Sequence, residues 1–372
     1  MIWLTWRQFR AQAVTAVAAL ALFAILLAVT HPQLASLDAT SGFAGCHVGS
    51  CGELADAFLG QLSNLTPFGG PQAFRLLPAG ANLYVIVYTV GILFILIAPA
   101  ITGVFWGAPL IARELETGTG RLAWNQSVTR IRWLTVKLAL TGAAAIAVTE
   151  GFSLLQAWWA APINRAIDLG GSVSVFSGSR FSPLNFATGG IAPLGYAAFG
   201  FALGVTAGLL IRRVVPAMAL TLAIFAGVQV VMPLWIRPHL LPTDQTTAAI
   251  AASRATLSDL GGATVLTASA VPGQPGAWII SSGAVNAAGQ PVSTLPAACT
   301  PTAQSPSPGP GSGTAFQSDV QRCLAGHGIR EAVSYQPASH YWPLQLTETG
   351  IFLALALGLA GFCLWWLDRR LA

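Results

Sequence analysis

The sequence predicts an all-α membrane protein: a bundle of six transmembrane helices, with an amphipathic interfacial helix at the N-terminus and a long external loop between helices 5 and 6. Only 8% of the 372 residues are charged and 54% are hydrophobic, with a mean hydropathy of +0.65, whereas about 25% of residues in soluble proteins are charged. The apolar residues gather in six runs of about 18 to 24 residues, and a helix of about 20 residues crosses a hydrocarbon core. A membrane β-barrel would show alternating runs of about ten residues instead.

The N-terminal residues before the first apolar run have a helical pattern of their own. Ile2, Trp6, Phe9 and Ala13 recur at helical spacing, which is typical of one apolar helix face. We expect a short helix lying in the membrane interface, with Trp3 and Trp6 at headgroup depth. The alternative is that these residues extend the first membrane helix.

The apolar runs divide the chain into three parts. The predicted membrane helices are residues 13–30, 83–105, 134–159, 189–211, 214–236 and 345–367. Residues 1–236 therefore hold helices 1 to 5, residues 237–344 form an external segment, and residues 345–372 hold helix 6 and the C-terminus.

The external segment has a mixed composition. Residues 272–313 are rich in Pro, Gly, Ser, Thr and Ala, which disfavours a compact core. We expect this stretch to be extended or mobile. The flanking residues 242–266 and 314–333 are expected to be helical and to form a small cap.

The positions of the basic residues predict the orientation in the membrane, because Lys and Arg are retained on the cytoplasmic side. If the N-terminus is cytoplasmic, so are 11 of the 18 Lys and Arg residues. Both termini are then predicted to be cytoplasmic. The net charge of +5 is explained by these flanks, and no nucleic-acid partner is expected because no basic patch with interleaved aromatic residues is present.

The cysteines agree with this topology. Cys46 and Cys51 lie in the first external loop, and Cys299 and Cys323 lie in the last. Two local disulfides are plausible in an oxidising exterior, the alternative being free or cross-paired thiols. We expect no metal site, because no set of four ligands has suitable spacing. Cys363 is expected to pack inside the sixth helix.

The sequence carries no motif for bond chemistry. Lys137 is the only lysine and is followed by Leu138, so the Gly-rich phosphate loop that ends in Lys-Ser or Lys-Thr is absent. We expect neither an enzymatic activity nor a cofactor in this chain. The polar residues inside predicted helices are Glu150, which we take as the one carboxylate well inside an apolar span, and Gln229. Such residues are costly in a membrane, and Glu150 either lines a path, takes up a proton or packs against a neighbour.

A charged loop, residues 107–133, connects predicted helices 2 and 3 on the cytoplasmic side. It contains Arg113, Glu114, Glu116 and Arg121. Residues 108–115 are predicted to form a helix near the membrane surface. The glycines of residues 117–120 would allow a sharp reversal after it.

Residues 107–120 (GAPLIARELETGTG) and 128–137 (VTRIRWLTVK) resemble the coupling segment in permease subunits of ABC transporters of the second exporter type. The resemblance implies six membrane helices and an amphipathic N-terminal helix. It also implies a permease homodimer or heterodimer in the lipid bilayer, docked on separate cytoplasmic subunits that bind ATP and Mg. Residues implied to contact the ATPase are Glu114, Glu116, Gly118 and Thr119, with Arg113 and Arg121 in the same segment.

The predicted function is the transmembrane permease subunit of an ATP-driven ABC transporter, an exporter, coupled through residues 107–133 to a separate ATPase. The alternative is a membrane-anchored sensor or assembly protein whose external segment binds a ligand or partner. A single lysine beside abundant Ala, Gly and Arg suggests a GC-rich bacterial genome, and hence a bacterial plasma membrane.

Overall fold

The computed structural model describes residues 2–46, 51–64, 82–117, 129–169, 171, 179–250, 256–260, 263–268, 271–292, 296, 299 and 313–370. The chain divides into two compact units. The first comprises Met1–Ile167, Gly171–Leu240 and Trp342–Ala372, and the second comprises Asp168–Gly170 and Leu241–Tyr341.

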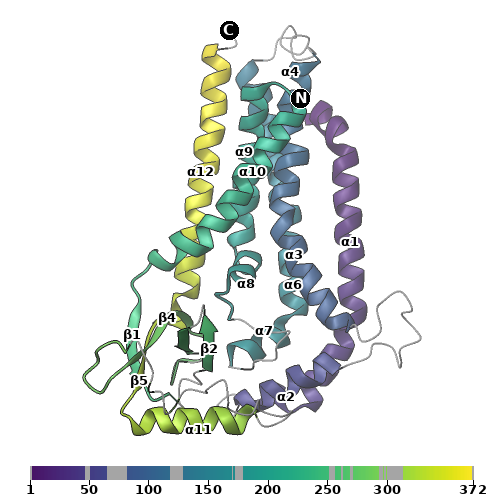
Figure 1. The fold of residues 1–372 in the computed structure, drawn as a ribbon. Helices are drawn as coiled ribbons and strands as arrows, with labels where there is room; N and C mark the ends of the chain where they lie inside the picture. The colour runs from purple at the N-terminus through teal and green to yellow at the C-terminus, as the bar shows by residue number, and fades with distance from the viewer. Residues whose placement is uncertain are drawn as a thin grey trace. The chain divides into compact units, whose positions relative to one another are not determined.

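The first unit is a helical bundle (Figure 1). Within the described residues, six helices are long and apolar enough to cross a membrane. The long elements are α1 (Ile2–Thr40), α3 (Leu83–Thr102), α6 (Arg130–Trp159), α9 (Ala192–Ile211), α10 (Val214–Val231) and α12 (Tyr341–Arg370). The shorter ones are η1 (Phe43–Gly45), α2 (Cys51–Asn64), η3 (Gly103–Gly107), α4 (Ala108–Glu116), α7 (Ala161–Asp168), α8 (Pro183–Thr188), η4 (Met232–Ile236) and η5 (Arg237–His239), whereas η6 (Ala338–His340) lies in the second unit. The predicted all-α membrane bundle with six spanning helices is confirmed.

The N-terminal residues do not form a separate helix in the described part of the chain. Instead, α1 is a single helix of 39 residues that begins at Ile2. No glycine or proline lies between Ile2 and His31, so nothing in this stretch interrupts the helix. This corresponds to the alternative of an extended first helix, while the interfacial position of its first turns stays a prediction.

The second predicted helix is longer than expected. The sequence analysis ended it near Phe105 and placed a separate surface helix in the loop, but α3 continues without a break through the π-helical turn η3 into α4 and ends at Glu116. Gly103 allows this long helix to approach α9 closely, because a Cβ atom there would lie 2.4 Å from the carbonyl oxygen of Gly200 on α9. The helix is thus held against α9 through backbone contact beyond the point where the apolar run stops.

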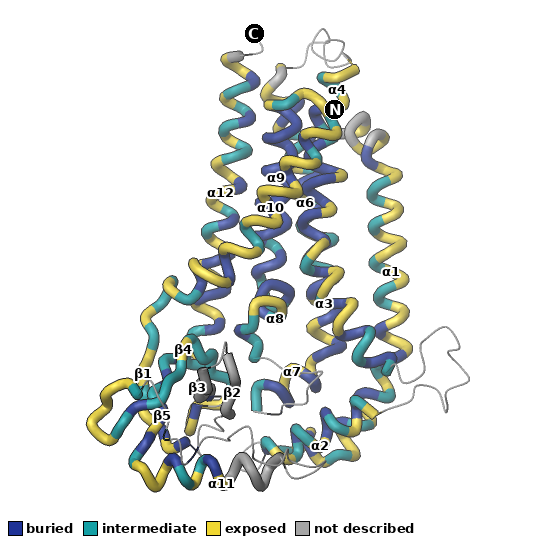
Figure 2. The backbone as a smooth tube through the Cα atoms, in the orientation of Figure 1, coloured by how far each residue is buried: buried dark blue, intermediate teal, exposed yellow. Residues whose placement is uncertain are grey.

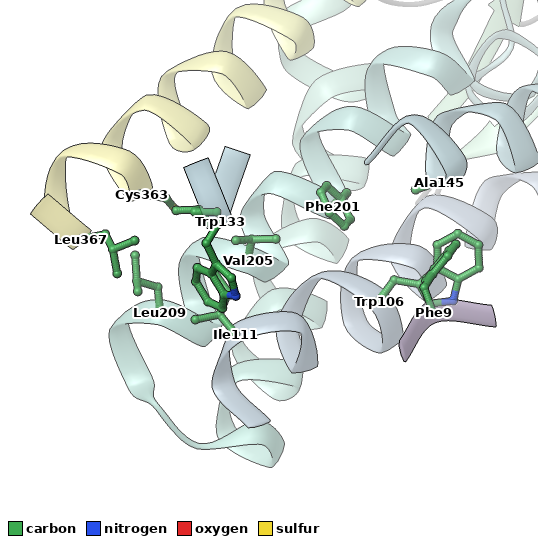
Figure 3. Packing of buried hydrophobic residues seen from close by; sticks show 11 residues of the cluster. Phe9, Trp106, Ile111, Trp133, Ala145, Phe201, Val205, Leu209, Cys363 and Leu367 are labelled. Atoms are coloured by element: carbon green, nitrogen blue, oxygen red, sulfur yellow. The ribbon is translucent and has the colours of Figure 1, made fainter. Parts of the chain in front are cut away.

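Helix α9 is the centre of the bundle. In the most apolar 18-residue stretch of α9, 83% of the residues are buried, compared with 11% in that of α1, and Figure 2 shows α9 buried along most of its length. A hydrophobic cluster beside it joins residues of α1, η3, α4, α6, α9 and α12 (Figure 3). Its members include Phe9, Trp106, Ile111, Trp133, Leu134, Ala145, Phe201, Val205, Leu209, Cys363 and Leu367. Cys363 therefore packs in the bundle, with its sulfur 3.3 Å from the hydroxyl of Thr206.

The second unit contains β-structure that the sequence analysis did not predict. Its strands are β1 (Asp244–Ala248), β2 (Thr256–Leu260), β3 (Ala263–Thr267), β4 (Trp278–Val285) and β5 (Arg330–Gln336), and α11 (Gly313–Gly326) is its helix. The strands form an antiparallel sheet of order β1-β5-β4 and a β2-β3 hairpin.

The predicted helix over residues 242–266 is therefore wrong. Thr and Val recur in β1, β2 and β3, and such β-branched residues favour strands. Part of the stretch that was expected to be extended or mobile, residues 272–313, forms the paired strand β4. In the other predicted flank, α11 is followed by β5.

Both disulfides join cysteines of the same segment. Cys46 and Cys51 are bonded in the first unit, and Cys299 and Cys323 in the second, where they lie in a hydrophobic cluster with residues of α11. Cys299 and Cys323 lie near His327. Because their sulfur atoms are bonded to each other, they are not free thiolates that could bind a metal ion beside this histidine.

Candidate functional site

Helix α4 lies at one end of the bundle and carries most of the charges that the sequence analysis selected. It packs on α9 and α10, where Ala108, Ala207 and Ala217 form a small buried cluster. Small side chains allow close approach of helices. The charged residues of α4 lie outside this buried face.

Glu114 connects α4 to α6. Its carboxylate accepts a hydrogen bond from the Nζ ammonium of Lys137 and forms an ion pair with it. The Lys137 side chain is only 3% exposed and its Nζ atom lies 4.6 Å from the centroid of the Trp133 ring. A buried cation is costly unless a counter-charge is present. The Glu114 carboxylate therefore stabilises the only lysine of the chain in its buried position.

Glu116 connects α4 to α10. Its Oε2 atom accepts a hydrogen bond of 3.2 Å from the backbone N–H of Val214, the first residue of α10. A carboxylate at a helix N-terminus also interacts favourably with the helix dipole. The last turn of α4 thus contacts two membrane helices through two carboxylates.

The structure brings together only part of the predicted coupling segment. Arg113 is exposed on α4, while Glu114 and Glu116 make contacts within the chain. Gly118, Thr119 and Arg121 lie outside the described residues. Contact of these residues with an ATPase stays a prediction.

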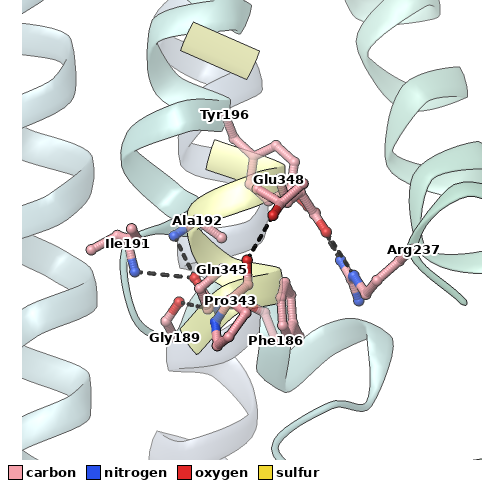
Figure 4. A network of polar contacts seen from close by, with 10 residues as sticks. Phe186, Gly189, Ile191, Ala192, Tyr196, Arg237, Pro343, Gln345 and Glu348 are labelled. Atoms are coloured by element: carbon pink, nitrogen blue, oxygen red, sulfur yellow. Dashed lines mark hydrogen bonds and ion pairs between the residues drawn. The ribbon is translucent and has the colours of Figure 1, made fainter. Parts of the chain in front are cut away.

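A second polar site, which the sequence analysis missed, joins α9, α12 and η5 (Figure 4). The Arg237 guanidinium donates hydrogen bonds of 2.8 Å and 3.0 Å to the two carboxylate oxygens of Glu348, and both side chains are fully buried. The Tyr196 hydroxyl contacts both residues, and the guanidinium lies 4.0 Å from the centroid of the Phe186 ring. This two-pronged geometry suits a buried ion pair.

Gln345, one turn before Glu348 on α12, joins the same region to the start of α9. Its Oε1 atom accepts hydrogen bonds from the backbone N–H groups of Ile191 and Ala192, and its Nε2 group donates to the carbonyl oxygens of Phe186 and Gly189. One side chain therefore satisfies backbone groups at the end of α8 and at the beginning of α9 that would otherwise be costly to bury.

A signal for this network was present in the sequence. Glu348 lies inside the predicted span 345–367, so taking Glu150 as the one carboxylate well inside a span was wrong. Arg237 directly follows the fifth predicted helix. An arginine and a glutamate at the same predicted membrane face are candidates for pairing, but their sequence separation of 111 residues gave no direct indication.

The two predicted intramembrane polar residues do not belong to this network. Glu150 is half-buried on α6, and neither its Oε2 atom nor the Nε2 atom of Gln229 on α10 has a hydrogen-bond partner among the described residues. Nearby on α6, Ser153 donates a 2.8 Å hydrogen bond to the carbonyl oxygen of Thr188. The roles of Glu150 and Gln229 stay predictions.

A comparison with protein families gives a match over residues 17–237, to the family described as ABC-2 membrane transporter related. The match covers more than half of the chain. The chain belongs to this family. No curated protein and no solved structure gives a match.

As an ABC-2 permease subunit, the chain is a membrane component of an ABC transporter, a class of machine that works with an ATPase partner. The matched range contains α4 together with both of its partners, Lys137 on α6 and Val214 on α10. It ends at Arg237, so the partner of this arginine, Glu348 on α12, lies beyond the part that the family match covers.

Proposed function

We propose that this ABC-2 permease is the membrane subunit of an exporter, and that α4 with the residues after it docks on a separate cytoplasmic ATPase that binds ATP and Mg. The observation that supports the docking role is the pair of contacts made by the end of α4. Glu114 joins it to α6 and Glu116 joins it to α10. A displacement of α4 would therefore act on two spanning helices at once.

The proposed mechanism is a bias between two arrangements of the bundle, imposed by the docked ATPase. An ATPase can shift such an equilibrium only by interacting differently with the two states. The continuous helix from Leu83 to Glu116 would carry displacement from the docking end into the membrane. The permease itself would contribute no bond chemistry.

The proposed assembly is a homodimer or heterodimer of permeases with all termini cytoplasmic. The distribution of Lys and Arg supports this orientation. The α1 side chains Val14, Val17 and Leu22 are more than 60% exposed in the single chain. Lipid or a second permease would cover these apolar side chains in the membrane.

The test is purification of the tagged chain from native membranes, followed by measurement of the co-purifying ATPase subunit and its ATP hydrolysis rate. Glu114→Lys would place two ammonium groups together, and Lys137→Glu would place two carboxylates together. The double swap restores an ion pair of the opposite sense. We expect stoichiometric ATPase with the wild type, lower hydrolysis in each single variant, and recovery in the double swap.

The control is Arg10→Gln, which removes an exposed charge on α1, outside residues 107–133, and should leave both readouts unchanged. If the double swap stays as impaired as Glu114→Lys, then the Glu114 carboxylate contacts the ATPase directly rather than through Lys137. Absence of any ATPase from the wild-type preparation would contradict the proposed coupling and favour a membrane-anchored sensor or assembly role.

A further inference from the structure

A cavity of about 480 Å³ lies where α1, η3–α4 and α6 meet at one end of the bundle. Pockets that hold small molecules are commonly about 300 to 1,000 Å³ in volume. All of its described lining residues belong to the helical bundle. The cavity therefore has the size of a ligand site and lies in one structural unit.

The lining has an apolar part and a polar part. Phe9 and Trp106 are buried and meet edge-to-face with their ring centroids 4.8 Å apart, and Leu110 lies beside them in the lining. On the polar side are Arg113 and the buried Lys137. An occupant with an apolar portion joined to a polar head would satisfy both parts.

The charges on the polar side favour an anionic head. Among the described lining residues, Arg113 and Lys137 provide two positive charges and Glu114 is the single carboxylate. Lys137 is already paired with Glu114, while Arg113 is exposed and has no ion pair among the described residues. An arginine fork suits phosphate oxygens in particular.

The cavity also lies at the depth of lipid headgroups, as judged from the ends of the apolar spans. The span of α1 begins at Phe9, the span that contains α3 and α4 ends at Glu116, and that of α6 begins at Ile131. Along the same helix Trp106 precedes Arg113 by about 10 Å, at 1.5 Å per residue. The aromatic side is therefore closer to the middle of that span than the arginine is.

We propose that this cavity binds the phosphate-bearing headgroup of an anionic phospholipid. Arg113, backed by Lys137, holds the phosphate, and Phe9, Trp106 and Leu110 contact the adjoining glycerol and first methylenes. Inorganic phosphate shares the anionic chemistry but would leave the apolar part of the cavity unfilled. Arg113 and Glu114 of the lining belong to α4, the helix proposed to dock on the ATPase, so lipid binding is tested with the purified chain alone.

The experiment uses the purified full-length chain in zwitterionic detergent, with retained lipid counted by native mass spectrometry. The probes are dioleoylphosphatidylglycerol, dioleoylphosphatidylcholine with the same acyl chains, and inorganic phosphate. We expect phosphatidylglycerol to be retained about fivefold better than phosphatidylcholine, the order of effect for one basic residue beside an anionic headgroup. Inorganic phosphate at equal concentration should not displace it.

Two variants test the cavity in different ways, with one matched control. Arg113→Gln removes the free guanidinium, and Leu110→Trp fills the apolar part while keeping every charge. Both should abolish the preference for phosphatidylglycerol. Arg132→Gln removes an exposed arginine of α6 that does not line the cavity, and the preference should persist.

Equal retention of the two lipids by the wild type would overturn the proposal without any variant, as would displacement of phosphatidylglycerol by inorganic phosphate. Equal loss in Arg113→Gln and Arg132→Gln would show diffuse surface charge instead of a site. A preference unchanged in Leu110→Trp, with the variant monodisperse on size exclusion, would place the lipid outside the cavity. A preference unchanged in Arg113→Gln would contradict the anionic recognition.

Discussion

At the scale of single residues, two of the ion pairs in the described part of the bundle have very different surroundings. Glu114 is 16% exposed beside Lys137, whereas Arg237 and Glu348 are both fully enclosed. Removing one partner of an enclosed pair leaves an uncompensated charge, which is far more costly than removing both. We therefore expect loss of Arg237 or Glu348 alone to lower the stability of the folded bundle.

We predict that Arg237→Met lowers the free energy of unfolding by about 3 to 5 kcal/mol, because it leaves the Glu348 carboxylate buried without its counter-charge. The double variant Arg237→Met/Glu348→Leu should recover most of this loss. Unfolding in mixed detergent micelles, followed by tryptophan fluorescence, gives both values. A double variant no more stable than the single one would show that the pair is not an isolated energetic unit.

The residue scale is also where the sequence was least informative. Lys137 was visible as the only lysine, but hydropathy does not say which carboxylate it meets. Glu348 lies in a predicted apolar span, but only the folded bundle places it beside Arg237. Partners separated by more than 100 residues depend on helix packing, which a single sequence does not specify.

At the scale of elements, the contact between α3–η3–α4 and α9 depends on the absence of side chains. A Cβ atom at Gly204 would lie 2.1 Å from the carbonyl oxygen of Gly103 and 2.9 Å from the backbone nitrogen of Ala108. Both atoms are backbone, so neither can move aside as a flexible side chain would. The two helices would have to separate.

We predict that Gly204→Ala destabilises the bundle by about 1 to 3 kcal/mol, the usual cost of overpacking. The matched control is Gly227→Ala on α10, where a Cβ atom would meet nothing within 4 Å. That control should gain about 0.5 to 1 kcal/mol from the better helix propensity of alanine. Thermal unfolding in detergent distinguishes the two, and equal shifts in both variants would contradict the close contact.

The membrane helices could largely be predicted from the sequence, but the residues at which they end could not. Six apolar runs gave six spanning helices because hydropathy reports directly on transfer into lipid. The predicted end of the second span was about ten residues too early. The charges of Arg113 and Glu114 indicated a loop in water, whereas Gly103 and Ala108 belong to a helix that packs on α9. The strands of the second unit were not predicted. Their threonine-rich alternating pattern is a weak signal in a segment whose composition is rich in Pro and Gly.

At the scale of the whole molecule, the chain joins a helical bundle to a unit built on a small sheet. In the second unit, the disulfide joins Cys299 and Cys323, which are 24 residues apart in the sequence. It lies in a hydrophobic cluster with Leu324 and Ile329. Small units with limited cores commonly depend on such covalent links.

We predict that Cys299→Ser/Cys323→Ser destabilises the second unit by about 3.5 kcal/mol, the loop-entropy value for this separation. Hydrogen exchange in the full-length protein should become faster in α11 and β5 while α9 stays protected. Cys46→Ser/Cys51→Ser, with a sequence separation of 5, should leave α11 unchanged. Faster exchange throughout the bundle in the first variant would show that the two units do not open separately.

The position of Gln345 and Glu348 on the last helix has a consequence for biogenesis. The hydrogen-bond partner of the N–H groups at the start of α9 is Gln345, which is synthesised 153 residues after Ala192. The partner of Arg237, Glu348, is likewise synthesised later. At about 5 to 20 residues per second a ribosome needs roughly 10 to 30 s to make that intervening stretch. Throughout this interval the fourth and fifth helices are in the translocation machinery or lipid without their polar partners. A nascent chain that stops short of α12 therefore lacks the side chains that pair with Arg237 and with the start of α9.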